Sequence, residues 1–163
     1  MIPSLQPSEA LHPLVVHLPV GVLLVAWIPI LIGLIDHRRR TTWFACGALL
    51  LVISAFGCVI AVMTGETAQG IVGAPSQIIA DAIHAHQSIA LRTRNLVIAT
   101  TFVFMAAWIV YAKVRESAKR RVLFVGSILA AITYASALIA LVNAGHSGGV
   151  LVHTHGVRAP IVP

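Results

Sequence analysis

Charged residues are scarce in this chain of 163 residues. Only 10% of the residues are charged and 58% are hydrophobic, whereas an average soluble domain is roughly 25% charged. Acidic residues are the rarest, with five Asp and Glu against eleven Lys and Arg. This balance excludes an ordinary soluble enzyme and indicates an integral membrane protein, with residues 1–163 forming a single domain.

Cysteine is also rare, because the chain has only Cys46 and Cys58. Both lie inside one apolar run, which favours buried small residues over a disulfide or a metal-binding pair. The sequence contains no Cys-x-x-Cys-His, which excludes covalently attached c-type haem. It also lacks His-Glu-x-x-His, the commonest signature of zinc proteases.

The basic residues are concentrated in two short segments. The formal net charge of +6 would suit a nucleic-acid binder in a soluble chain, but eight of the eleven Lys and Arg residues lie within 36–40 and 113–121. These segments fall between apolar runs, as cytoplasmic loops of membrane proteins do. We therefore expect the partner of the chain to be a lipid bilayer and not a nucleic acid.

Four apolar runs are each close to the length of about 20 residues that a helix needs to cross a bilayer. They predict an all-α, integral membrane four-helix bundle. The third span is expected to belong to a longer helix that begins near Ser76, a plausible N-cap, and projects beyond the bilayer. An outer tail is expected over residues 145–163. The predicted spans are residues 14–35, 42–64, 92–112 and 122–143.

The two basic segments also predict the orientation of the bundle. Positively charged loops stay on the cytoplasmic side, so both termini are expected outside (N-out/C-out). In a bacterium this corresponds to a multi-pass protein of the inner (cell) membrane with periplasmic termini.

Seven of the eight histidines are expected on the outer side, with His37 as the exception. Counted from the basic end of each helix at about 1.5 Å per residue, four of them and one glutamate lie about 31 to 41 Å up, beyond a hydrocarbon core of about 30 Å. Interfacial histidines are also found solvated or at helix ends, and Glu66 fits the polar end of a helix. The joint pattern nevertheless suggests a ligand set. Its members are His12, His17, Glu66, His86 and His146.

Imidazole is a ligand for haem iron, zinc and copper. A non-covalent haem b held by two histidines from different helices fits a bundle with few carboxylates, and zinc or copper remains the alternative. We expect His17 and His86 as the axial pair of the haem iron. The remaining candidates are His12, His146 and His155 for the cofactor and Arg92 or Arg94 for the haem propionates, unless these arginines extend to lipid headgroups.

Four short motifs stand in order along the chain: His12-Pro13-x-x-x-His17-x-Pro19, Thr64-Gly65-Glu66, His86-Gln87 and Gly148-Gly149-x-Leu151-Val152-x-x-His155-Gly156-Val157. Together they resemble those of the bacterial four-helix membrane proteins catalogued as domain of unknown function 2231. The resemblance covers nearly the whole chain and implies a small inner-membrane protein without settling its function. Two positions depart from the family pattern: Gln87 stands where a glutamate is frequent and His153 where an aromatic residue is usual.

Two main functions follow as hypotheses. The first is a b-type cytochrome-like electron-transfer subunit that exchanges electrons with a quinol or a periplasmic cytochrome near the outer face. The second is a non-redox accessory or structural subunit of a larger membrane complex. A zinc- or copper-dependent enzyme is a third, weaker possibility, because no arrangement of nucleophile and base stands out.

Overall fold

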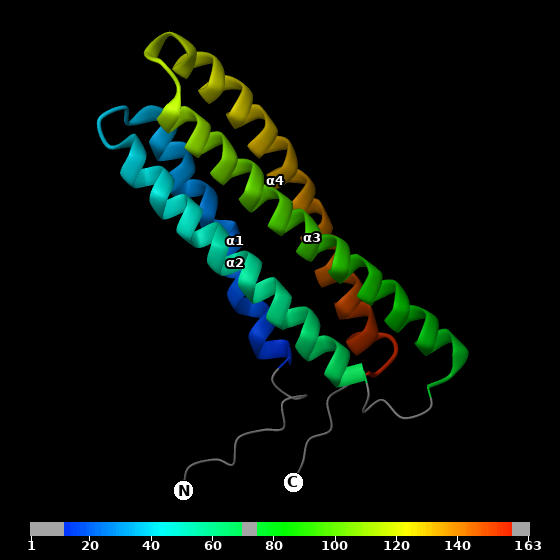
Figure 1. Cartoon of the computed structure of the whole chain (residues 1–163). Coiled ribbons are helices and arrows are strands. Elements are labelled where there is room, and N and C mark those ends of the chain that lie inside the picture. The colour runs from blue at the N-terminus through cyan, green and yellow to red at the C-terminus, as the bar shows by residue number, and fades with distance from the viewer. Residues whose placement is uncertain (1–11, 70–74, 158–163) are drawn as a thin grey trace, which may run out of the picture.

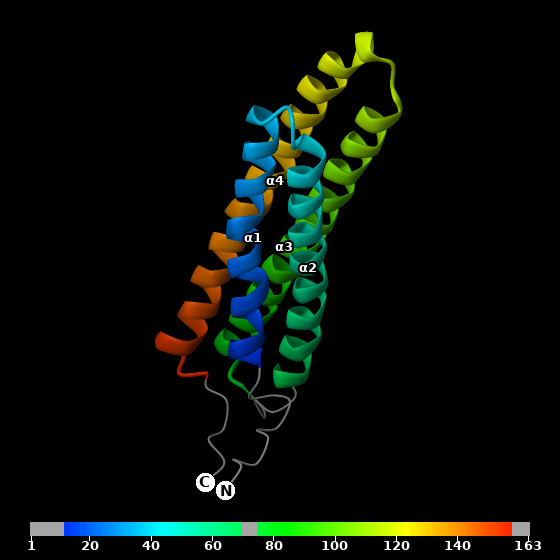
Figure 2. The same ribbon diagram turned by 90° about the vertical axis from the view of Figure 1, so that its left-hand side faces the viewer.

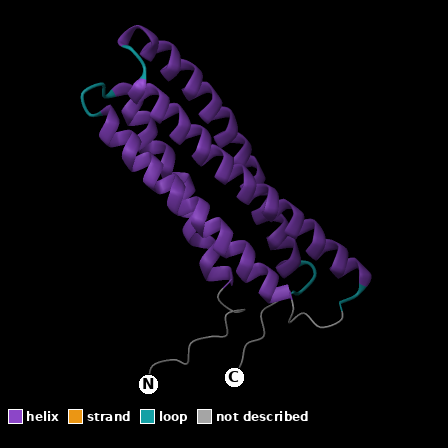
Figure 3. Cartoon of the chain, in the orientation of Figure 1, coloured by secondary structure: helices purple, strands orange, loops and turns teal. Residues whose placement is uncertain are grey.

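The computed structural model describes residues 12–69 and 75–157. Every regular element within these ranges is a helix: α1 (His12–Ile35), α2 (Arg40–Gln69), α3 (Gln77–Lys113) and α4 (Glu116–His153). The helices run alternately up and down, so the start of α1 and the end of α4 lie at the same end of the bundle (Figure 1; Figure 3). The predicted all-α four-helix architecture is confirmed.

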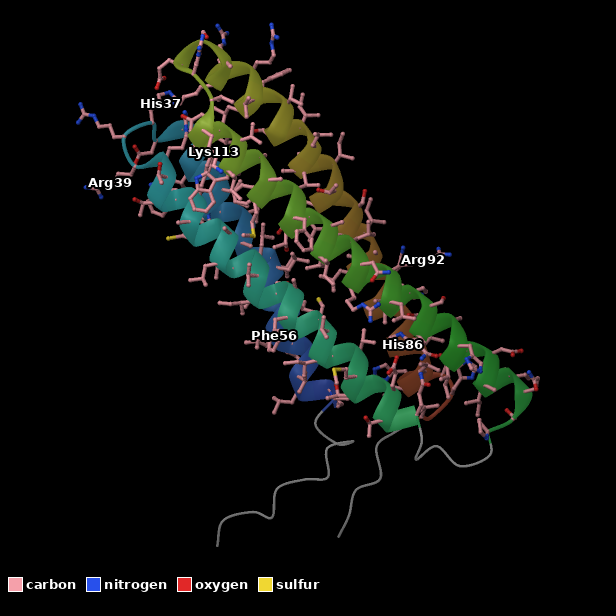
Figure 4. The ribbon with its side chains drawn as sticks, viewed as in Figure 1. His37, Arg39, Phe56, His86, Arg92 and Lys113 are labelled. Atoms are coloured by element: carbon pink, nitrogen blue, oxygen red, sulfur yellow. The ribbon has the colours of Figure 1, made fainter. Side chains whose placement is uncertain are left out.

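All four helices are long and apolar enough to cross a membrane. Their large apolar side chains point outward in many places, for example Phe56, which is 68% exposed and projects from α2 (Figure 4). An apolar surface that points outward is stable only against the hydrocarbon of a bilayer, because the hydrocarbon contains no water. The chain is therefore a multi-pass membrane protein in a lipid bilayer.

The two hairpins differ in length. Helix α3 has 37 residues and α4 has 38, against 24 in α1. The turn between α3 and α4 extends beyond the turn between α1 and α2 (Figure 2). The expected continuous third helix is present, with Ser76 immediately before it, although the Ser76 hydroxyl makes no capping hydrogen bond.

The last helix continues further than the apolar run predicts. The sequence places a tail from residue 145, but α4 runs through Gly145 and Gly148 to His153, so the beginning of that tail is helical. Intrahelical hydrogen bonds are retained because no proline interrupts this stretch, and Gly148 packs against a side chain of α3. The remainder of the expected tail beyond Val157 lies outside the described residues.

Small residues allow the helices of each hairpin to approach closely. A Cβ atom at Gly57 of α2 would lie 2.9 Å from Cβ of Pro19 in α1, and one at Gly126 of α4 would lie 2.7 Å from Cβ of Ala107 in α3. Both distances are too short for a side chain, so glycine is required for this separation. The bundle therefore consists of two tight hairpins, α1–α2 and α3–α4, which meet mainly through α2 and α3.

The core between the hairpins combines aromatic packing with polar contacts. Phe44 of α2 and Phe104 of α3 meet edge to face with ring centroids 5.6 Å apart. Thr101 donates hydrogen bonds to the carbonyls of Val97 and, at 3.3 Å, of Leu51 in α2. Such interhelical hydrogen bonds help to hold helices together in lipid, where hydrophobic burial gives little preference for association.

The basic residues gather at one end of the bundle. His37, Arg39 and Lys113 lie there, and His86 lies toward the opposite end (Figure 4). Asp36 accepts hydrogen bonds from the backbone N–H groups of Arg38 and Arg39 and from the Trp43 indole. These donors, led by the Arg39 N–H, hold the pKa of Asp36 below its ordinary value.

Candidate functional site

His12 is the first residue of α1, and its imidazole is directed at the end of α2. Its Nδ1 lies 3.0 Å from Oγ1 of Thr64. The Thr64 hydroxyl in turn donates to the carbonyl of Ala61, also at 3.0 Å. Because the single hydroxyl proton is used in this way, the hydroxyl oxygen accepts a hydrogen bond from the Nδ1–H group of His12.

His86 repeats the same arrangement in the second hairpin. The side chain lies ten residues into α3 and is half-buried, and it projects toward the interior of the bundle (Figure 4). Its Nδ1 lies 2.8 Å from Oγ of Ser147 in α4. The Ser147 hydroxyl donates to the carbonyl of Ala144 at 3.0 Å, so its oxygen accepts a hydrogen bond from the Nδ1–H group of His86.

A glycine follows each of these hydroxyl residues and makes room for the ring. A Cβ atom at Gly65 would lie 3.0 Å from Cε1 of His12, and one at Gly148 would lie 3.1 Å from Cε1 of His86. Each imidazole therefore packs against the backbone of the neighbouring helix. The two hairpins present equivalent units, His12 with Thr64-Gly65 and His86 with Ser147-Gly148.

This hydrogen bonding determines which ring nitrogen of each imidazole is free to bind a ligand. With Nδ1 protonated, Nε2 carries the free lone pair, and among the described residues Nε2 of neither ring has a hydrogen-bond partner. A metal-binding histidine is typically arranged in this way, with its second nitrogen donating to a polar group.

His17 has a different environment from His12 and His86. Its side chain is exposed, and its Nδ1 is hydrogen-bonded to the carbonyl of Pro13 in the preceding turn of α1. The pairing of His17 with His86 stays a prediction. Of the two histidines of α1, His12 is the one that contacts a second helix.

The other candidates lie around this end without joining the two units. His146, His153, His84 and Glu66 are exposed. His155 is half-buried in the turn after α4, where its backbone N–H binds the carbonyl of Val150.

The two candidate arginines follow His86 along α3. Arg92 is exposed and points away from the other helices (Figure 4). The guanidinium of Arg94 donates to the side chain of the adjacent Asn95. Neither arginine contacts the two imidazole units.

Within residues 12–69 and 75–157, no group of three or more His, Cys, Asp or Glu side chains is placed to hold a metal ion. Zinc sites use three or four such ligands. The described residues thus provide a pair of imidazoles instead of a cluster.

Thr64 and Ser147 were not identified as functional residues from the sequence. A hydroxyl near the end of an apolar run is common, since it bonds readily to its own helix. The signal that would have identified them is their repetition, because each second helix of a hairpin carries a hydroxyl residue followed by glycine near its end: Thr64-Gly65 and Ser147-Gly148.

These features define a helical-bundle membrane protein with a cation-rich end and a histidine-bearing end. The chain belongs to the family described as "Predicted membrane protein (DUF2231)", whose model matches residues 8–160. The resemblance seen in the sequence is thereby confirmed over nearly the whole chain. Comparison with curated proteins and with solved structures gives no match.

Proposed function

We propose that this protein is a small b-type cytochrome-like electron-transfer subunit, in which Nε2 of His12 and Nε2 of His86 ligate a haem b iron. The observation that carries the proposal is the matched pair of half-buried imidazoles from different hairpins, each with Nδ1 bound to a hydroxyl. His17, His146 and His155 remain the further candidate ligands, with His17 as the first substitute for His12.

The number of imidazoles favours haem over the alternatives. A bis-histidine haem needs two axial ligands, because the porphyrin supplies the other four nitrogens. Zinc or copper would need a larger protein set than the described residues bring together. A haem b bound there would supply one-electron redox chemistry between a donor, such as a quinol or a periplasmic cytochrome, and an acceptor.

The charge distribution predicts which end of the bundle faces outward. Arg39 and Lys113 lie at the end opposite to His86 (Figure 4), and they belong to the two basic segments 36–40 and 113–121. Positively charged loops are retained in the cytoplasm. The histidine-bearing end therefore faces outward, which is the periplasm if the chain resides in a bacterial inner membrane. Both helix termini at that end, the start of α1 and the end of α4, then lie outside.

Arg92 is the proposed partner for a haem propionate. It lies six residues from His86 along α3, about 9 Å at 1.5 Å per residue. Its exposed guanidinium can meet a carboxylate only at the bundle surface, where an anionic group is least costly to place. A single haem at one end cannot carry an electron across a core of about 30 Å, so we propose that the donor and the acceptor meet at the outer face as parts of a larger assembly.

The test is a reduced-minus-oxidised absorbance spectrum of the purified wild-type protein, expressed with haem in excess. The proposal expects the sharp bands of a six-coordinate b haem after reduction by dithionite and by a quinol. Native-gel mass spectrometry after extraction in mild detergent would identify the associated subunits. A protein without haem under these conditions contradicts the electron-transfer proposal and leaves the accessory-subunit reading.

A further inference from the structure

The bundle has a long apolar groove between α1 and α4, in the half that is nearer the basic end. Its volume is about 580 Å³, and it is lined from α1 by Trp27 and Leu31, from α4 by Ala131, and at its floor by Phe104 of α3. It exists because α1 and α4 make little direct contact, whereas each packs tightly on its own hairpin partner. The groove lies apart from the two imidazole units.

The two ends of the groove differ in chemistry. Toward the middle of the bundle, the Tyr134 hydroxyl of α4 donates to the carbonyl of Leu23 in α1 and joins the two helices. Toward the basic end, the groove continues into an open hollow of about 660 Å³ lined by Ser117, Arg120 and Arg121. The groove and the hollow share lining residues, so they form one continuous surface: Leu34, Leu123 and Ser127.

The two arginines at this mouth lack acidic partners. The salt bridge between Lys119 and Glu116 is the only one within the described parts of the chain. Asp36 is the acidic residue of the other basic segment, and its carboxylate is hydrogen-bonded to backbone N–H groups and to an indole. Arg120 and Arg121 are exposed and face the hollow without a counter-charge among the described residues.

We propose that this surface binds one anionic glycerophospholipid from the leaflet at the basic end. An acyl chain lies in the apolar groove, and the phosphate is bound by the guanidinium groups of Arg120 and Arg121. Guanidinium groups bind phosphate through paired, charge-assisted hydrogen bonds. Basic pockets between transmembrane helices on the cytoplasmic side have the chemistry that recognises anionic headgroups.

The dimensions favour a lipid chain. The groove follows α4 from Val122 to Leu138, about 24 Å at 1.5 Å per residue. One leaflet contributes about 15 Å of hydrocarbon, half of a core of about 30 Å, so a chain of leaflet length fits lengthwise.

The charges separate a phospholipid from the other apolar occupants. A quinone has an uncharged head and gives the two arginines no counter-ion. A second copy of this chain would bring further cations, because its net charge is +6. The phosphate of a phospholipid supplies the missing negative charge at the depth where the arginines lie.

The experiment measures lipid retained by the purified full-length chain in nanodiscs made of equal parts phosphatidylglycerol and phosphatidylcholine. After release into detergent, native mass spectrometry counts the lipids that stay bound. The wild-type chain should retain one phosphatidylglycerol in preference to phosphatidylcholine. Arg120→Gln with Arg121→Gln should reduce that preference about 25-fold, taking roughly fivefold for each cation near a headgroup.

A matched control removes the same charge elsewhere on the same end. Arg38→Gln with Arg115→Gln should change the preference less than twofold, because neither residue lines the groove or the hollow. Ala131→Trp should fill the groove and displace the acyl chain while leaving the arginines in place. Equal losses in the two double variants, equal retention of the two lipids by the wild type, or a quinone or a second chain in the groove would each overturn the proposal.

Discussion

The imidazole of His86 in α3 and the hydroxyl of Ser147 in α4 are joined by a hydrogen bond of 2.8 Å. His12 and Thr64 form the corresponding bond of 3.0 Å between α1 and α2. Each contact joins the two helices of one hairpin at the histidine-bearing end of the bundle. They also fix which ring nitrogen of each histidine is free to bind a ligand.

Removal of the Ser147 hydroxyl should destabilise this end of the bundle. In Ser147→Ala, His86 loses its acceptor, and we expect a loss of about 0.6 to 1.5 kcal/mol in the free energy of unfolding. Ser147→Thr keeps a hydroxyl and should retain most of that free energy. Denaturant unfolding in detergent, followed by circular dichroism, measures both.

The matched control for this prediction is Ser136→Ala in the same helix. The Ser136 hydroxyl bonds only to the carbonyl of Ile132, one turn earlier in α4. This variant should unfold within about 0.5 kcal/mol of the wild type. Equal destabilisation by the two alanine variants would contradict an interhelical role for Ser147.

Alanine substitutions at two glycines of α4 should change the stability of the protein in opposite directions. A Cβ atom at Gly148 would lie 3.1 Å from Cε1 of His86, whereas nothing lies within 4 Å of one at Gly145. We expect Gly148→Ala to cost about 1 kcal/mol or more through crowding. Gly145→Ala should stabilise the helix by up to about 1 kcal/mol. Thermal unfolding of the two variants side by side tests the difference in sign.

Asp36 should give a pH-dependent contribution to stability. Its pKa is lower in the folded state than the ordinary value of 3.8, mainly because the Arg39 N–H stabilises the carboxylate. A carboxyl with a lowered folded pKa stabilises the protein above its unfolded pKa and loses that contribution as the pH falls through the folded value. The stability difference between wild type and Asp36→Asn should be constant above about pH 5 and should shrink below pH 3.8. A difference independent of pH across this range would show that the carboxylate is not involved.

The orientation can be tested with single cysteines in a chain whose own cysteines are replaced by Cys46→Ala and Cys58→Ala. Ser76→Cys lies just before α3 and Ser117→Cys lies in the first turn of α4, and both positions are exposed. An impermeant maleimide applied from outside should label Ser76→Cys in intact cells, and Ser117→Cys only after lysis. The reverse pattern would place the histidine-bearing end in the cytoplasm.

The sequence alone was sufficient for the architecture. Apolar runs of span length and basic residues between them predicted four helices, because both signals depend on transfer between water and lipid. The sequence also predicted a long third helix that begins near Ser76, which the structure has as Gln77–Lys113. These are properties of single segments, so they can be read without knowing the packing.

The rotation of each helix was not predictable in the same way. Depth counted along α1 favoured His17, but the described structure directs His12 at α2 and leaves His17 exposed. Which face of an all-apolar helix turns inward depends on close contacts such as Pro19 on Gly57, and hydrophobicity carries no signal for them. Thr64 and Ser147 were missed for the same reason, since their partners are 52 and 61 residues away in sequence.

The most direct test of the bis-histidine haem proposal is the absorbance of reduced haem in purified His12→Ala and His86→Ala, with His84→Ala as the matched control. His84 is exposed on the same helix as His86. The proposal predicts that the first two variants lose the six-coordinate b-haem spectrum, whereas His84→Ala keeps it. Full retention of that spectrum in His12→Ala and His86→Ala would contradict the account.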